Sequence, residues 1–110
     1  MSRIGSVKFN GASGREYFFG VYSIDTDFNN VRAVYAFSKR IVKDEVGFHE
    51  VLYIGETEEL GTRIKNHEKW PCVNNNGANC ICVHPEEEKE SRIDKESDLK
   101  FNYYAPCNDH

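Results

Sequence analysis

Five runs of apolar, β-branched and aromatic residues, each bounded by polar or turn-forming residues, are the feature that most constrains the fold of this chain. The runs are residues 6–10, 15–24, 31–37, 50–55 and 80–83. The first two flank residues 11–14, which include two glycines and a serine, so they predict a β-hairpin. A polar connection around residues 43–47 joins the third run to the fourth. We therefore expect a small antiparallel sheet that includes an N-terminal hairpin.

Two helices are expected beside these strands. Thr57 is a suitable N-cap for the first, with two glutamates in the first turn, and this helix should end before Pro71. Residues 74–77 should form a loop, and Pro85 fits the first position of the second helix, with three glutamates behind it. Three pairs spaced to interact along the surface of that helix are Glu88–Arg92, Arg92–Glu96 and Glu96–Lys100. With an extended tail over residues 105–110, the elements predict an α+β fold, a small antiparallel β-sheet flanked by helices.

Length and apolar patterning limit where such a chain can work. A chain of 110 residues has room for one domain with one hydrophobic core. It has no apolar run of the roughly 20 residues needed to span a bilayer, and residues 1–6 lack the apolar segment of a secretory signal. We therefore expect a cytoplasmic protein without membrane contact. The four cysteines should then be reduced thiols, namely Cys72, Cys80, Cys82 and Cys107.

The net charge of −4 is unevenly distributed along the chain. Residues 85–98 contain seven acids and three bases, which account for the whole −4. Residues 31–43 contain no acid, and they include Arg32, Lys39, Arg40 and Lys43. An acidic helix and a local basic patch can therefore coexist on one small protein. The negative total argues against a protein built only to grip nucleic acid.

A set of polar and aromatic residues follows one another in a recognisable order. Ala33-Val34-Tyr35 lies in the third run and Tyr53-Ile54-Gly55 in the fourth, with Arg63 and His67 ten and fourteen residues after Tyr53. Glu96 lies in the second expected helix, and Pro106 and Asn108 follow near the end of the chain. Over roughly residues 31–108 this arrangement resembles the GIY-YIG nuclease superfamily, which includes homing endonucleases and the incision subunit of bacterial excision repair. Tyr-Ile-Gly alone carries little weight, but the full ordered set is specific.

The resemblance implies a metal-dependent DNA endonuclease, an enzyme that hydrolyses phosphodiester bonds. Glu96 would bind one Mg²⁺ or Mn²⁺ ion, Arg63 would hold the scissile phosphate, and Tyr35 or Tyr53 would accept the proton of the attacking water. His67 and Asn108 complete the catalytic set, with Asn108 holding the site in register. The expected nucleic-acid-binding residues are Gly55, Lys39, Arg40, Lys43 and Lys65. Residues 31–110 would form the nuclease core, and residues 1–30 an added N-terminal β-hairpin of the same domain.

Some residues depart from the family pattern and keep other functions open. Ala33 replaces the first glycine of the motif, and Glu56 stands where some family members have a lysine. With few cations near the site, we expect weak, non-specific DNA binding by the isolated chain. Tight cleavage would then depend on a partner protein, an oligomer or a special DNA structure, with the N-terminal hairpin as the surface for a partner. One alternative is a catalytically weak nuclease-like module that binds nucleic acid or a protein partner. Another is a small zinc-binding protein that uses Cys72, Cys80, Cys82 and His84.

Overall fold

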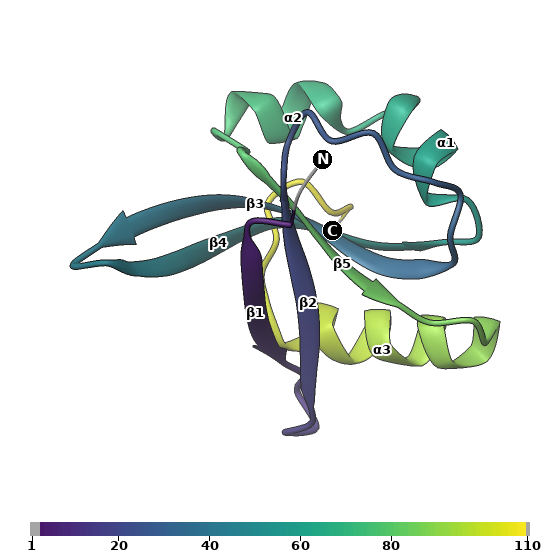
Figure 1. The fold of residues 1–110 in the computed structure, drawn as a ribbon. Helices are drawn as coiled ribbons and strands as arrows, with labels where there is room; N and C mark the ends of the chain where they lie inside the picture. The colour runs from purple at the N-terminus through teal and green to yellow at the C-terminus, as the bar shows by residue number, and fades with distance from the viewer. Residues whose placement is uncertain (1–2, 110) are drawn as a thin grey trace.

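A computed structural model describes residues 3–109 of the chain, so Met1, Ser2 and His110 lie outside the described residues. Within them a curled, five-stranded antiparallel sheet has the strand order β1-β2-β5-β3-β4. The strands are β1 (Gly5–Asn10), β2 (Glu16–Ser23), β3 (Ala33–Lys43), β4 (Val46–Thr57) and β5 (Cys80–Pro85). Helices α1 (Leu60–Lys65) and α2 (Trp70–Asn75) lie on one side of the sheet, and α3 (Lys89–Asn102) lies on the other (Figure 1). The expected α+β class, an antiparallel sheet flanked by helices, is confirmed.

Alternation of side chains along the strands divides the interior into two layers. In β3, Val34 and Ala36 pack in the layer that contains Leu99 of α3. Tyr35 and Phe37 point the other way, into the layer that contains the buried residues of α1 and α2. Because β3 is buried on both faces, it is apolar from Ala33 to Phe37, without the polar alternation of a half-exposed strand.

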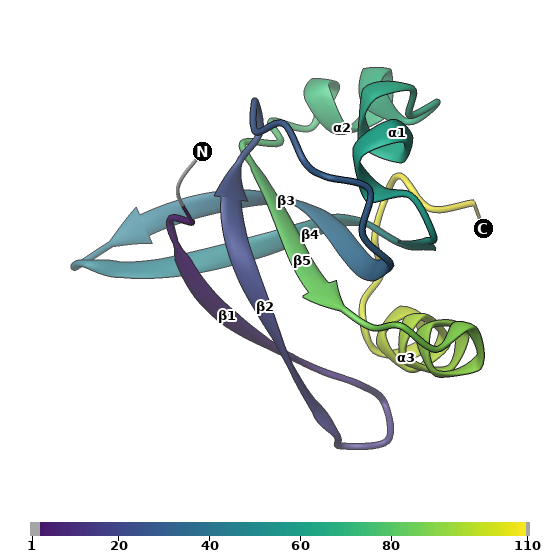
Figure 2. The ribbon, with the colours of Figure 1, turned by 45° about the vertical axis from the view of Figure 1, so that its right-hand side comes forward.

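The N-terminal hairpin is present and forms one edge of the sheet. β1 pairs with β2 over the whole length of β1, from Gly5 opposite Val21 to Asn10 opposite Glu16. β2 in turn pairs with β5, which lies beside the central strand β3. The hairpin therefore continues the sheet directly, as both views of the ribbon show (Figures 1 and 2).

The third and fourth strands are longer than the sequence predicted, and the polar connection between them is shorter. Only Asp44 and Glu45 separate β3 from β4, and both have positive φ, 52° and 64°. Two consecutive residues of this kind make a tight hairpin turn whose twist matches that of the flanking strands. The paired strands therefore continue beyond the sheet as a projecting arm, residues 38–51 (Figure 1).

The first helix begins two residues later than predicted, at Leu60 with Glu59 at the N-cap position. Thr57 is the last residue of β4, and its hydroxyl accepts the N–H of Glu59, so it does not cap α1. The free N–H groups of α1 are instead bound by the segment before β3. Val31 O accepts the N–H of Leu60, and the side-chain oxygen of Asn30 accepts the N–H of Thr62. Because the groups that cap α1 lie far upstream in the sequence, no local pattern marks the start of the helix, and this explains why the predicted start is wrong.

Two prolines also occupy positions other than those predicted. Pro71 lies in the first turn of α2, where its missing N–H costs no hydrogen bond, and α2 then includes Asn74 and Asn75 of the expected loop. Pro85 is the last residue of β5, and α3 starts four residues after it, at Lys89. The glutamates expected in the first turn of α3 therefore precede the helix, and only Glu90 lies in that turn.

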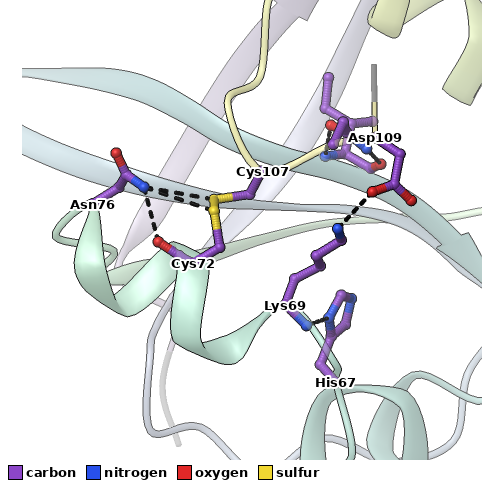
Figure 3. The surroundings of a disulfide bond; sticks show 8 residues. His67, Lys69, Cys72, Asn76, Cys107 and Asp109 are labelled. Carbon is purple, nitrogen blue, oxygen red and sulfur yellow. Dashed lines mark hydrogen bonds and ion pairs between the residues drawn. A yellow bond between two sulfur atoms is a disulfide. The ribbon is translucent and has the colours of Figure 1, made fainter.

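The prediction of four reduced cysteines is wrong for two of them. Cys72 of α2 and Cys107 of the C-terminal tail form a disulfide across 35 residues of sequence (Figure 3). Cys80 and Cys82 are free and buried in β5, where burial raises the pKa of the Cys82 thiol to about 12. The tail reaches α2 because the backbone N–H of Cys107 donates to Leu52 O in β4. Sequence spacing cannot reveal such a contact. No helix among residues 3–109 is long and apolar enough to cross a membrane.

Candidate functional site

The hydroxyl of Tyr35 and the ring of His67 form a buried hydrogen bond at the centre of the candidate site. Tyr35 Oη lies 2.7 Å from His67 Nε2, and the two side chains are 0% and 4% exposed. Tyr35 belongs to β3, whereas His67 lies two residues beyond the end of α1. The expectation that Arg63 and His67 share one helix is therefore wrong. Because α1 ends at Lys65, the chain can turn His67 down onto the sheet.

A β-bulge in β4 brings Tyr53 to the same side of the sheet. Phe37 pairs with Tyr53 but the next residue, Ser38, pairs with Val51, so Leu52 is the extra residue. Leu52 and Tyr53 consequently both face the layer that contains Tyr35. The rings of Tyr53 and Tyr35 have centroids 6.0 Å apart, and the ring of Tyr53 lies 4.8 Å from that of His67.

Gly55 leaves the space into which both tyrosine rings fit. A Cβ atom at Gly55 would come within 2.8 Å of Tyr35 Cζ and 2.9 Å of Tyr53 Cε2, closer than real Cβ contacts. The sequence suggested that Gly55 would let the backbone approach nucleic acid. In the structure, Tyr35 and Tyr53 occupy the space above Gly55, so its lack of a side chain serves the packing of the two rings.

The backbone next to His67 fixes the position of its proton. The N–H of Lys69 donates to His67 Nδ1 over 3.1 Å, so Nδ1 is an acceptor (Figure 3). Burial, reinforced by the nearby charge of Arg63, lowers the pKa of His67 to about 4, so the ring is neutral near pH 7. A neutral imidazole with an accepting Nδ1 carries its proton on Nε2. His67 therefore donates to the Tyr35 oxygen.

The Tyr35 hydroxyl has two further polar neighbours, Arg63 and Tyr53. Burial and the neighbouring Tyr53 raise the pKa of Tyr35 above its usual value of 10, and the positive charge of Arg63 opposes this, so Tyr35 stays protonated. Because Tyr35 accepts from His67, its own proton is left to donate. The ring of Tyr53, which is partly exposed, lies beside it with the two centroids 6.0 Å apart.

The planar fork of Arg63 is bound by an acid that the sequence analysis did not single out. Glu68 accepts from both terminal nitrogens of Arg63, with the second contact at 3.0 Å. These bonds from Arg63 lower the pKa of Glu68 to about 2. Glu68 is 61% exposed, so the pair lies at the surface, where an anion from solution can compete for the same fork.

Glu96 approaches β4 from the opposite side of the sheet. It lies on α3, is 20% exposed, and lies close enough to the backbone of Glu56, the residue after Gly55, for that backbone to lower its pKa slightly. Burial raises the pKa of Glu96 above its usual range, and Lys100 opposes this from 3.6 Å. The predicted Glu96–Lys100 pair is thus present. Glu96 meets β4 one residue away from the glycine on which Tyr35 and Tyr53 pack.

Arg92 does not pair with Glu88 or Glu96 along the helix surface, as the spacing predicted. It is 1% exposed, binds Glu56 Oε1 at 2.9 Å and lies 3.7 Å from Glu58. Its guanidinium also donates to the carbonyl oxygens of Glu86 and Glu87. A guanidinium with this many partners can be buried. The signal in the sequence was the spacing of Arg92 and Leu99, seven residues or two turns apart on α3, and they are its two buried residues.

Asn108 holds the C-terminal tail against β4. Its amide accepts the N–H of Ile54 and donates to Ile54 O, both at 2.9 Å. This pair of bonds satisfies an edge strand as a neighbouring strand would. Asn108 therefore fixes the backbone of β4 between Tyr53 and Gly55.

The four lysines and arginines expected to bind nucleic acid lie on separate elements. Lys39, Arg40 and Lys43 lie on the β3–β4 arm, which points away from α1, where Lys65 lies (Figure 1). The arm also carries Asp44, Glu45 and Glu50. The structure therefore gathers the tyrosines, Arg63 and His67, but it does not gather the cations into one patch.

Metal-binding side chains are sparse in this site. Residues 3–109 contain no group of three or more His, Cys, Asp or Glu side chains placed to hold a metal ion. In the Cys-His array, the Cys72 sulfur is bonded to Cys107, and His84 is held by Phe18 O and Lys95. No protein-family model, curated protein or solved structure matches this chain, so the candidate site rests on its own geometry.

We predict that His67 makes the protein less stable as the pH falls below 6.5. An unfolded chain protonates its histidines near pH 6.5, whereas the folded pKa of His67 is about 4, so between these values the proton favours the unfolded state. Urea unfolding of the parent and of His67→Gln at several pH values from 4.5 to 6.5 measures the effect. The free energy of unfolding of the parent should rise more steeply with pH, by up to about 1.4 kcal/mol per pH unit.

The pKa of His49 is also lowered by burial, so His49 contributes a slope of the same sign in both proteins. The difference between the two slopes therefore reports His67 alone. Equal slopes would show that His67 is not held neutral by its surroundings.

Proposed function

We propose that this chain is a metal-dependent DNA endonuclease of the GIY-YIG type, with a core over residues 31–110 and the N-terminal hairpin as an addition to it. The observation that carries the proposal is the cluster of Tyr35, Tyr53, Arg63 and His67. These residues are spread over three elements and a loop, yet they come together, with a buried hydrogen bond between Tyr35 and His67 and the ring of Tyr53 packed against both. Their order and spacing resemble those of the family, and the contacts among them are consistent with the role proposed for each residue.

Tyr53 is the better of the two tyrosines for accepting the proton of an attacking water. Tyr35 is buried, and its oxygen already accepts from His67. Tyr53 is partly exposed, and as a phenolate it would accept the Tyr35 hydroxyl hydrogen without any rearrangement of the donors behind it. In this proposal Tyr35 and His67 position Tyr53 and stabilise its negative charge.

Glu96 is the residue that would hold a Mg²⁺ or Mn²⁺ ion. Its carboxylate is partly exposed, and hard cations prefer oxygen ligands and keep several of their waters. A bound ion supplies charge stabilisation for the phosphate oxygens and the leaving oxygen. Glu56 is less suited to bind the ion, because its side chain pairs with Arg92.

Arg63 would bind the scissile phosphate in place of Glu68. A phosphate offers the same two-oxygen geometry as the carboxylate, so the fork suits either anion. Substrate must displace Glu68, and the arm cations lie elsewhere on the molecule (Figure 1). We therefore expect weak binding to ordinary duplex with a shallow salt dependence.

The second candidate is a nuclease-like module that binds nucleic acid or a protein without cleaving. The pairing of Arg63 with Glu68 favours it, because that pair occupies the residue needed for phosphate binding. A zinc protein is less well supported, since the sulfur of Cys72 is used in the disulfide. Cleavage assays separate the two nuclease-like candidates.

We predict that the chain nicks supercoiled plasmid with Mg²⁺ or Mn²⁺, and that Glu96→Gln slows nicking by at least about 100-fold. The change keeps the shape of the side chain and removes a carboxylate whose ionisation burial already disfavours, so the fold should survive. Gel separation of nicked from supercoiled plasmid over time gives the rates, and a reaction with chelator gives the rate without metal.

Glu87→Gln is the matched control, because it removes the same charge from an exposed residue just before α3. It should nick at the parent rate. Equal nicking by the parent and Glu96→Gln would refute the role of Glu96. A parent protein that binds DNA but never nicks it would favour the second candidate.

We predict that Tyr53→Phe abolishes nicking, whereas Tyr35→Phe slows it less and lowers stability more. Loss of the Tyr53 hydroxyl removes the proton acceptor, worth about 10²–10⁴-fold in rate. Loss of the Tyr35 hydroxyl leaves His67 Nε2 without an acceptor in the interior, at a cost of about 1–3 kcal/mol. Single-turnover nicking and urea unfolding measure the two effects, with Tyr22→Phe as the control. Full activity of Tyr53→Phe would show that Tyr53 is not the proton acceptor.

We predict that Glu68→Gln tightens duplex binding by about fivefold at low salt. The Arg63–Glu68 pair is exposed and worth at most about 1 kcal/mol, which corresponds to that factor. Fluorescence anisotropy of labelled duplex measures the dissociation constants. Glu59→Gln removes an equal charge near the start of α1 without freeing Arg63, so it should have the smaller effect. If both variants bind alike, net charge alone explains the change and Arg63 is not the phosphate ligand.

A further inference from the structure

One face of α3 is exposed although it carries large apolar residues. The phenyl ring of Phe101 is 85% exposed and Ile93 is 43% exposed, whereas Arg92 and Leu99 on the opposite face are buried. At 100° per residue, the exposed positions of α3 between Glu90 and Phe101 fall within about 60° of Ser97. They are Glu90, Ile93, Asp94, Ser97, Lys100 and Phe101. We call this set the α3 face.

The α3 face is complementary to itself. If two copies of α3 cross in antiparallel orientation at Ser97, each residue lies opposite the one at the same distance on the other side of Ser97. Ile93 then meets Phe101 of the other copy, and Asp94 meets Lys100. Both kinds of pair are favourable, one apolar and one of opposite charge.

The crossing point also has a suitable shape. Ser97 is the smallest residue of the α3 face, and small residues at a crossing let two helices approach closely. A shallow hollow, lined by Ser97, Lys100 and Phe101, lies beside it. In the antiparallel arrangement, Ile93 of the second copy lies opposite Phe101 and would fill that hollow.

We propose that the α3 face binds a second copy of this chain, with the two α3 helices antiparallel about a twofold axis at Ser97. The charges favour this partner over nucleic acid, because Glu90 and Asp94 outnumber Lys100 on the face and would repel phosphates. A twofold contact closes on itself, so assembly stops at the dimer.

The contact is small, so the dimer forms reversibly. One helix face per partner stays at or below the roughly 1,200 Å² of total area at which stable interfaces begin. Mass should therefore change with protein concentration. The inference does not rest on the proposed function, because dimerisation is measured without DNA or metal.

Sedimentation velocity of the full chain over a wide concentration range tests the proposal. The parent should pass from monomer to dimer, and Phe101→Ala should raise the dissociation constant about tenfold or more. Phe101 is almost fully exposed in the monomer, so its removal leaves the fold intact. Phe18→Ala, which removes a ring that is 63% exposed on β2, is the matched control and should dimerise as the parent does. A parent that stays monomeric at all concentrations, or a dimer that responds to Phe18→Ala and not to Phe101→Ala, would overturn the proposal.

Charge reversal tests the antiparallel register. Asp94→Lys places two lysines opposite each other at both ends of the contact, and Lys100→Asp does the same with two aspartates, so each variant alone should be monomeric. An equimolar mixture of the two should form a dimer, because each pair again joins opposite charges. A mixture that stays monomeric would overturn the antiparallel register. Circular dichroism checks that both variants fold. Asp94→Lys leaves the Glu96–Lys100 pair in place, so a dimer that survives this change would show that the α3 face is not used.

Discussion

The extra residue in β4 is the constraint on which the candidate site depends. The tight turn pairs Lys43 with Val46. If that register continued along the strands without the bulge at Leu52, Tyr53 would lie opposite Ala36 and its side chain would point to the side of α3. With it, Tyr53 shares a face with Tyr35, and both rings pack over Gly55. His67 can then complete the cluster because α1 is short and ends before it. The bulge in β4 and the early end of α1 thus bring together side chains from β3, β4 and the loop after α1.

A buried guanidinium joins α3, the helix that carries Glu96, to the same strand. Arg92 binds Glu56 of β4 and, at the same time, the carbonyl oxygens of the two residues that lead to α3. These bonds fix the start of α3 relative to β4. Glu96 lies one helical turn further along, and there it meets the backbone of Glu56. Removing one partner from a buried ion pair leaves an uncompensated charge and costs about 3–5 kcal/mol, so loss of Glu56 should be more disruptive than loss of an acid from an exposed pair.

The sequence predicted the strands better than the helix ends, for a physical reason. Strand formation follows local residue type and burial, and the apolar run at β3 is visible without any knowledge of its neighbours. The start of α1 depends on Asn30, which lies far from the helix in sequence, so Thr57 was a misleading signal. The disulfide between Cys72 and Cys107 and the burial of Arg92 likewise depend on contacts between distant elements. The ordered tyrosines, Arg63 and His67 could be recognised from spacing, whereas Glu68 could not, because its role arises only from the geometry of the fork.

The acidic character of the chain limits how it can act on a polyanion. Glu68 occupies the arginine fork nearest the tyrosines, and the cations of the arm lie on a separate part of the molecule (Figure 2). A single copy therefore offers few phosphate contacts at any one place. The proposed dimer would carry two sets of phosphate-binding residues, one on each copy. Once one copy has bound DNA, the other would bind the same molecule at a raised effective concentration. Avidity of this kind needs no additional basic residue. If the chain acts on DNA as proposed, avidity would let it do so through an assembly whose contact surface is itself partly acidic.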